Sequence, residues 1–135
     1  MHVKKLGVAL LMWACLILPQ GAWGADAVRE AMNRSAQKYF HYAMVLGGEA
    51  RYDEAVKALD QAIGAKPDFA EAYSMKGSCL EKLGNDREAE TAYRKALQIN
   101  PSYGEGYYYL GNLLKKMGKT AEAETMLQKA RQFQR

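Results

Sequence analysis

Residues 70–103 decide the fold, and they read AEAYSMKGSCLEKLGNDREAETAYRKALQINPSY. Small and bulky side chains recur at helical spacing on both sides of the turn signal Gly84-Asn85. They are Tyr73, Gly77 and Leu80 before the turn and Ala89, Tyr93 and Ala96 after it. The stretch therefore predicts two amphipathic helices joined as a hairpin.

The same pattern occurs once before this stretch and once after it, at a spacing of 34 residues. The matched columns are Tyr39/Tyr73/Tyr107, Ala43/Gly77/Gly111, Leu46/Leu80/Leu114, Ala55/Ala89/Ala123, Leu59/Tyr93/Leu127 and Ala62/Ala96/Ala130. A hairpin of this size cannot bury its apolar face alone, so copies must stack on one another. We expect three stacked hairpins, called units 1, 2 and 3, over residues 36–69, 70–103 and 104–135, after a helical extension over residues 25–35.

Two kinds of signal predict where the helices end and begin. Pro67 and Pro101 disfavour a helical conformation in the residue before them, so the second helices of units 1 and 2 should end there. Capping boxes, in which a short polar side chain and a Glu three residues later satisfy free amides, are predicted at the next helix starts. These pairs are Asp68 with Glu71 and Ser102 with Glu105.

The column order of bulky, small, bulky, Ala, bulky, Ala and Pro resembles the tetratricopeptide repeat. The resemblance implies an all-α fold, a right-handed superhelical solenoid of three repeats that acts as a scaffold for other proteins. Unit 1 departs modestly from the pattern: it has Tyr42 in place of a Leu, Ala43 as the small residue, Ala50 where later units have Gly84 and Gly118, and Gly47-Gly48 at the end of its first helix.

The resemblance also implies where a partner binds, because the family's groove is lined by first-helix residues one step from the core columns. The groove residues carried over to this chain are Phe40, Met44, Ser74, Ser78, Tyr108 and Asn112. Members that grip a chaperone's C-terminal carboxylate place Lys, Arg and Asn in columns that here hold Phe40, Met44, Met75, Glu105 and Tyr109. We therefore expect an apolar, aromatic groove for a protein or peptide segment.

The last unit differs from the others at the position that meets a following repeat. Ile63 and Leu97 occupy this column in units 1 and 2, whereas unit 3 has Arg131. A charge there indicates a cap at the end of the stack. Self-association of the chain through its exposed faces, giving a homo-oligomer, stays open as an alternative to partner binding.

The first 24 residues have the three parts of a secretory signal peptide. A positive start at Met1–Lys5 is followed by an apolar run at Leu6–Leu18 and a break ending in small residues at Pro19–Gly24. The apolar run has 13 residues, whereas a membrane span needs about 20. We therefore expect cleavage between Gly24 and Ala25, no stable membrane span, and export to the periplasm or envelope of a bacterium.

Charge and composition exclude several classes of function. Without Lys4 and Lys5 the chain has 17 basic and 15 acidic residues, dispersed along its length, so no basic stripe suggests nucleic-acid binding. Beyond residue 24 there is one histidine, His41, and one cysteine, Cys79, too few for a zinc site. We expect no catalytic residues, metal or cofactor; a thiol-dependent enzyme using Cys79 is a remote alternative.

Overall fold

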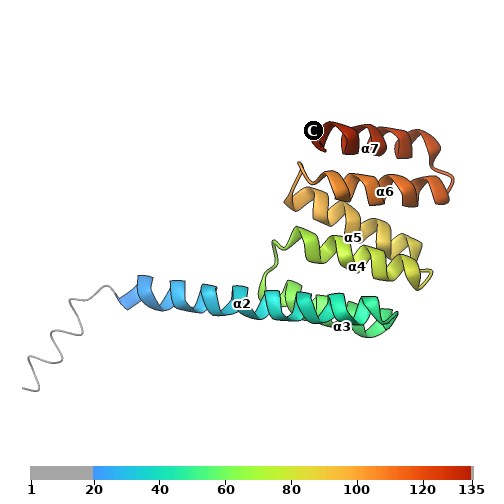
Figure 1. Cartoon of the computed structure of the whole chain (residues 1–135). Helices are drawn as coiled ribbons and strands as arrows, with labels where there is room; N and C mark the ends of the chain where they lie inside the picture. Colours follow the sequence, from blue (N-terminus) through green and yellow to red (C-terminus); the bar gives the residue numbers. More distant parts are fainter. Residues whose placement is uncertain (1–19, 135) are drawn as a thin grey trace, which may run out of the picture. The chain divides into compact units, whose positions relative to one another are not determined.

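The computed structural model describes residues 20–134, which form six α-helices and contain no β-strand (Figure 1). The helices are α2 (Gln20–Gly48), α3 (Tyr52–Ala65), α4 (Ala70–Lys82), α5 (Asp86–Ile99), α6 (Gly104–Lys116) and α7 (Thr120–Phe133). The chain divides into a compact region up to Met32 and another from Asn33 onward. All three predicted hairpins lie in the second region.

Helices in this second region pack as the 34-residue period predicts. Helix α4 packs against α5 and α6 against α7, while contacts of α3 with α4 and of α5 with α6 join one hairpin to the next. The stacked hairpins can be followed in Figure 1 from α2 and α3 through to α7. The prediction of an all-α solenoid is confirmed.

The predicted signal peptide over residues 1–24 lies mostly outside the described residues. Gln20–Gly24 belong to α2, so the expected cut between Gly24 and Ala25 falls in a helical segment. The extension over residues 25–35 is helical and continues into the first helix of unit 1. None of the helices within residues 20–134 is both long and apolar enough to span a bilayer.

The turn inside each hairpin has the same backbone geometry in all three units. Ala50, Gly84 and Gly118 take positive φ angles of 59°, 82° and 81°, a left-handed conformation that glycine adopts without steric cost. The next residue's amide donates to a carbonyl in the last turn of the first helix, as from Asn85 to Leu80 at 2.9 Å. Unit 1 thus holds an alanine in a conformation that favours glycine.

Helix ends follow the proline prediction and contradict the capping boxes. Lys66 and Asn100, directly before the prolines, are extended and end α3 and α5. Helices α4 and α6 start one residue later than predicted, with Phe69 and Tyr103 as N-caps and no side-chain cap bond. The capping-box prediction is wrong, because the cap positions are taken by Phe69, which packs on Phe40 of unit 1, and by Tyr103.

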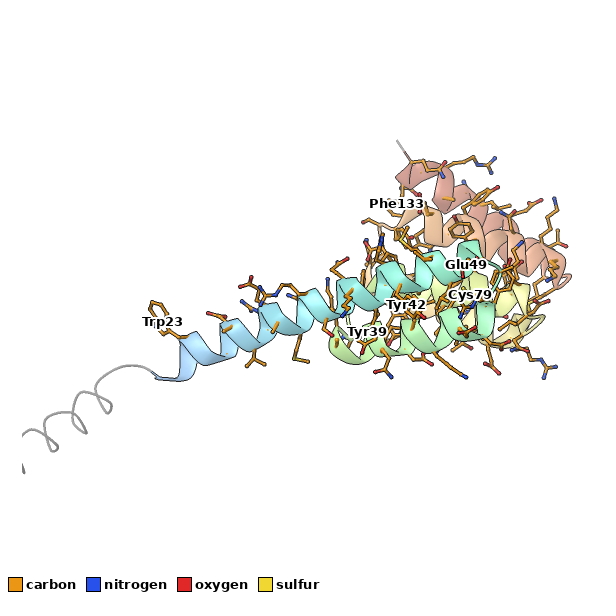
Figure 2. The ribbon with its side chains drawn as sticks, turned by 60° about the horizontal axis from the view of Figure 1, so that its bottom comes forward. Trp23, Tyr39, Tyr42, Glu49, Cys79 and Phe133 are labelled. Atoms are coloured by element: carbon orange, nitrogen blue, oxygen red, sulfur yellow. The ribbon has the colours of Figure 1, made fainter. Side chains whose placement is uncertain are left out.

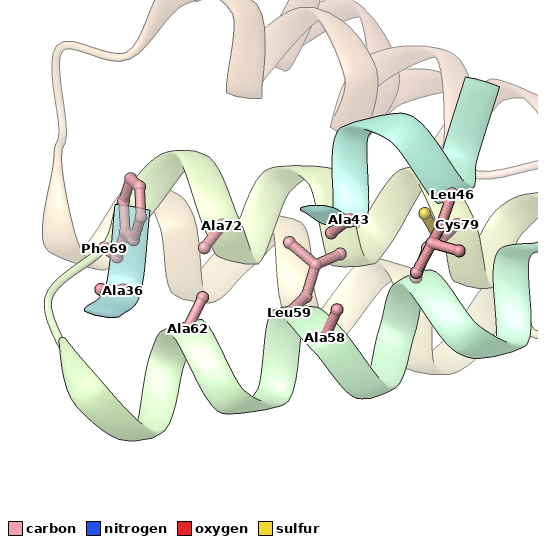
Figure 3. Close-up of a cluster of buried hydrophobic side chains, with 10 residues drawn as sticks. Ala36, Ala43, Leu46, Ala58, Leu59, Ala62, Phe69, Ala72 and Cys79 are labelled. Carbon is pink, nitrogen blue, oxygen red and sulfur yellow. The ribbon is translucent and has the colours of Figure 1, made fainter. Parts of the chain in front are cut away.

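Alanines dominate the first core cluster, which joins α2, α3 and α4 (Figure 3). Ala36, Ala43, Ala55 and Ala62 have no exposed surface, and such small side chains let helix backbones approach closely. Leu46, Leu59 and Phe69 fill the space between them. The first unit is therefore held to the second by apolar contact.

The second core cluster joins units 2 and 3 and uses glycine at its helix crossings. A Cβ on Gly77 would lie 2.8 Å from two ring carbons of Tyr93, and one on Gly111 would lie 2.7 Å from Cγ of Leu127. These distances are shorter than carbon atoms tolerate. The small column of the repeat is thus required wherever a large side chain crosses it.

Ion pairs connect the outer parts of units 2 and 3. Nζ of Lys119 lies 3.0 Å from the Glu90 carboxylate, and Arg94 pairs with both Glu90 and Glu122. Burial would raise the pKa of Glu90, but hydrogen bonds from Arg94 and Lys119 outweigh it and hold this pKa below its usual value. The network adds charge-assisted hydrogen bonds to the apolar contacts between these units.

Candidate partner-binding surface

The predicted groove residues differ in exposure because each unit covers part of the one before it. Phe40 is half-buried, since the Phe69 ring at the start of α4 lies 4.8 Å from its centroid. Ser74, in the same column of unit 2, is only 3% exposed. Hydrogen bonding between the Ser74 and Tyr103 side chains lowers the pKa of Tyr103, but burial outweighs it and raises this pKa above its usual value. Ser74 therefore offers no surface to a partner.

Tyr108 occupies this column in unit 3 and is 49% exposed. No following unit within the described residues places an aromatic ring over it. The phenol ring of Tyr108 meets that of Tyr109 edge-on at 5.8 Å, and Tyr109 stacks on Tyr93 at 6.0 Å. Burial, with the nearby Glu81 carboxylate, raises the pKa of Tyr93 well above its usual range. This aromatic row links the exposed face of α6 to the core.

The neighbouring column is open in units 1 and 3. Met44 on α2 is 49% exposed, and Asn112 on α6 is also exposed. Ser78 on α4 is half-buried, and its hydroxyl lowers the pKa of Tyr93 against the larger effect of burial. Met44, Tyr108 and Asn112 are thus the predicted residues with the most surface to offer.

Sequence reasoning missed a second exposed apolar set on α2. Tyr42 and Val45 are 51% and 48% exposed, and Tyr39 is exposed beside them (Figure 2). In unit 3 the columns of Tyr42 and Val45 hold Leu110 and Leu113, which are buried between units. Their exposure could have been predicted from the sequence. These columns face the preceding unit, and no unit precedes unit 1 within the described residues.

Two tetratricopeptide repeat family models match the chain, one over residues 43–104 and the other over residues 92–125. The chain belongs to the tetratricopeptide repeat family. The predicted repeat identity is therefore confirmed. No curated protein matches the chain.

Solved tetratricopeptide structures share the fold. A crystal structure of MamA superposes with a TM-score of 0.71 at 26% identity, over 74% of this chain and 58% of that one. This chain therefore spans little more than half the length of that protein. The second repeat domain of Spaghetti (RPAP3), bound to the HSP90 peptide SRMEEVD, superposes with a TM-score of 0.73 at 20% identity, over 77% of this chain and 98% of that one.

The only cysteine among the described residues of this tetratricopeptide chain lies in the core. Cys79 is buried beside Leu46 (Figure 3), and burial raises the pKa of its thiol. A nucleophilic cysteine needs the opposite shift, because the thiolate is the reactive form. Within residues 20–134 no three His, Cys, Asp or Glu side chains are grouped so that they could hold a metal ion.

Proposed function

We propose that this chain is a non-catalytic interaction protein of the bacterial periplasm or cell envelope that holds a partner segment against its first helices. The observation that carries the proposal is the exposed apolar surface of Met44 and Tyr108. Met44 lies on α2 in unit 1 and Tyr108 on α6 in unit 3, in neighbouring columns of the first helices. Asn112, one turn beyond Tyr108 on α6, can hydrogen-bond a peptide backbone through its amide. The buried Cys79 thiol, whose pKa is raised by burial, supports a non-catalytic role.

The bound segment differs in kind from an acidic chaperone tail. The RPAP3 domain was solved with the HSP90 peptide SRMEEVD, yet the columns that bind a carboxylate in such family members hold no cation in this chain. Glu71 and Glu105 are exposed on α4 and α6 and would repel an acidic peptide. An apolar or aromatic segment fits the exposed Met44 and Tyr108 better.

The test compares partner capture by matched variants. Phe40 is unsuitable as a target because it packs against Phe69, so the variant combines Met44→Ala with Tyr108→Ala. The control is Tyr42→Ala, which removes an aromatic of equal exposure from the face of α2 that would meet a preceding unit. In-cell crosslinking with mass spectrometry should show partner capture lost in the double variant and kept in the control. Capture that survives the double variant would place the binding surface elsewhere.

Export is tested separately. We expect the chain recovered from the cell envelope to begin at Ala25, because the apolar run Leu6–Leu18 is too short for a span and is followed by small residues. Intact-mass measurement of the envelope fraction distinguishes this from a membrane-anchored full chain. A full-length mass in the membrane would contradict export as a cleaved protein.

Self-association is the second candidate, favoured by the exposed Tyr39, Tyr42 and Val45 on α2. Two copies could cover these side chains by pairing the same face, as most homodimers do. Sedimentation equilibrium of the wild type and of Tyr42→Glu separates the candidates. A dimer that Tyr42→Glu dissolves supports self-association, and a monomer at every concentration excludes it.

A further inference from the structure

Within residues 20–134, the third hairpin leaves uncovered a face that the first two hairpins bury. In unit 1 this face is covered by Phe69, which lies over Phe40, and in unit 2 Tyr103 bonds to the buried Ser74. In unit 3 the matching Tyr108 is half exposed. It lines a shallow depression between α6 and α7, together with Asn112, Leu127, Ala130, Arg131 and Gln134.

The covering helices share a short pattern at their starts. Helix α4 is entered through Phe69-Ala70-Glu71-Ala72 and α6 through Tyr103-Gly104-Glu105-Gly106. The aromatic residue reaches back over the preceding unit. The small residue three positions later meets the column of Ile63 and Leu97: a Cβ on Gly106 would lie 3.0 Å from Cδ2 of Leu97. An occupant of the unit 3 face must satisfy both positions.

Arg131 changes which residue fits the second position, three residues after the aromatic of the covering helix. It takes the column of Ile63 and Leu97 on the unit 3 face and is exposed. A helix docked there in the same register would bring its third residue after the aromatic against the guanidinium. We propose that this end face binds a helix of a partner protein that begins with an aromatic, a small residue next, and an acidic residue three positions after the aromatic.

A second copy of this chain does not fit that description. If unit 1 of another copy were stacked on unit 3, Ser35 would stand where Phe69 and Tyr103 stand, and Lys38 where Ala72 and Gly106 stand. Tyr108 would then have no aromatic ring over it, and Lys38 would lie against Arg131, which has the same charge. The end face therefore selects a different protein. This surface shares Tyr108 and Asn112 with the proposed first-helix groove, but only the end-face proposal depends on Arg131, which lies on α7.

The test uses peptides built from this chain's own covering helix. One peptide carries residues 101–117 with Gly106→Asp, and its matched control carries Gly106→Lys at the same position. Labelled peptides are titrated against the full chain by fluorescence anisotropy. The acidic peptide should bind about fivefold more tightly, the ratio expected for one solvent-accessible ion pair.

Reversing the charge of Arg131 tests whether this residue selects the acidic helix. Arg131→Glu should invert the preference so that the Gly106→Lys peptide binds more tightly, while Lys95→Glu, on exposed α5 surface, should leave the ratio unchanged. The same two helices fused after Arg135 at the 34-residue register give a second readout, in which the acidic fusion should melt at the higher temperature. An equal response to both helices in binding and in melting would overturn the proposal. So would self-association that Arg131→Glu strengthens, because it would identify the occupant as a second copy.

Discussion

Replacing Gly77 by Ala should destabilise the chain even though it improves helix propensity. The new Cβ would lie 2.8 Å from Cδ1 and Cε1 of Tyr93 and 3.1 Å from its Cγ. The ring cannot move aside freely: it is 1% exposed, stacks on Tyr109, and its hydroxyl donates to Glu81 at 3.3 Å. Overpacking of this kind costs about 1–3 kcal/mol.

Gly64 provides the matched control. It also lies inside a helix, in α3, but a Cβ there would meet nothing within 4 Å. Gly64→Ala should therefore show only the gain in helix propensity, up to about 1 kcal/mol. The free energies of unfolding of the two variants should differ by about 1–3 kcal/mol, the overpacking cost at Gly77 alone.

The assay is urea and thermal unfolding followed by circular dichroism. A change of 1 kcal/mol moves the midpoint of a domain this size by roughly 4–8 °C, so a rise for Gly64→Ala and a fall for Gly77→Ala are easily resolved. Adding Tyr93→Leu to Gly77→Ala recreates the Ala43 and Leu59 pairing of unit 1 and should recover much of the loss. The reasoning is refuted if Gly77→Ala stabilises as much as Gly64→Ala. It is also refuted if Gly77→Ala costs as much in the Tyr93→Leu background as in the wild type.

Further predictions follow from the turns, the ion pairs and the core. Ala50→Gly should stabilise by up to about 1 kcal/mol, because Ala50 has a φ of 59°, and a melting curve tests it. Glu90→Gln should lower the free energy of unfolding by about 1 kcal/mol at neutral pH. Because the pKa of Glu90 in the folded chain is lowered from 4.5, the unfolding free energies of wild type and variant, measured by urea titration, should converge as pH falls below 4.5. Cys79 should react with iodoacetamide only when urea unfolds the chain, since burial raises its pKa. Ala89→Leu should cost about 1–3 kcal/mol, because Ala89 has no exposed surface; unchanged melting would contradict the repeat register.

The fold was predictable because each matched column is a local packing requirement that recurs. Gly77 and Gly111 are small because Tyr93 and Leu127 cross them, and the 34-residue spacing repeats that crossing in each unit. The helix starts were harder to predict. Asp68 and Ser102 look like caps, but the aromatic residues after them take the cap positions. Phe69 packs on Phe40 and Tyr103 hydrogen-bonds with Ser74, so contacts between units compete with local capping at the starts of α4 and α6.

The candidate site was only partly predictable, because exposure in a stacked repeat depends on the neighbouring hairpin and not on the residue's own column. Phe40, Ser74 and Tyr108 are equivalent in sequence register, yet one is half-buried under Phe69, one is buried, and one is open at the end of the stack. The groove pattern implied by the family treats all three alike. What separates them is whether another hairpin follows, so the two ends of the stack must differ from its middle. The same logic explains why Tyr42 on α2 is exposed while Leu110, in its column, is buried. Among residues 20–134, the exposed large apolar side chains therefore lie on α2, α6 and α7, in the first and last of the three hairpins.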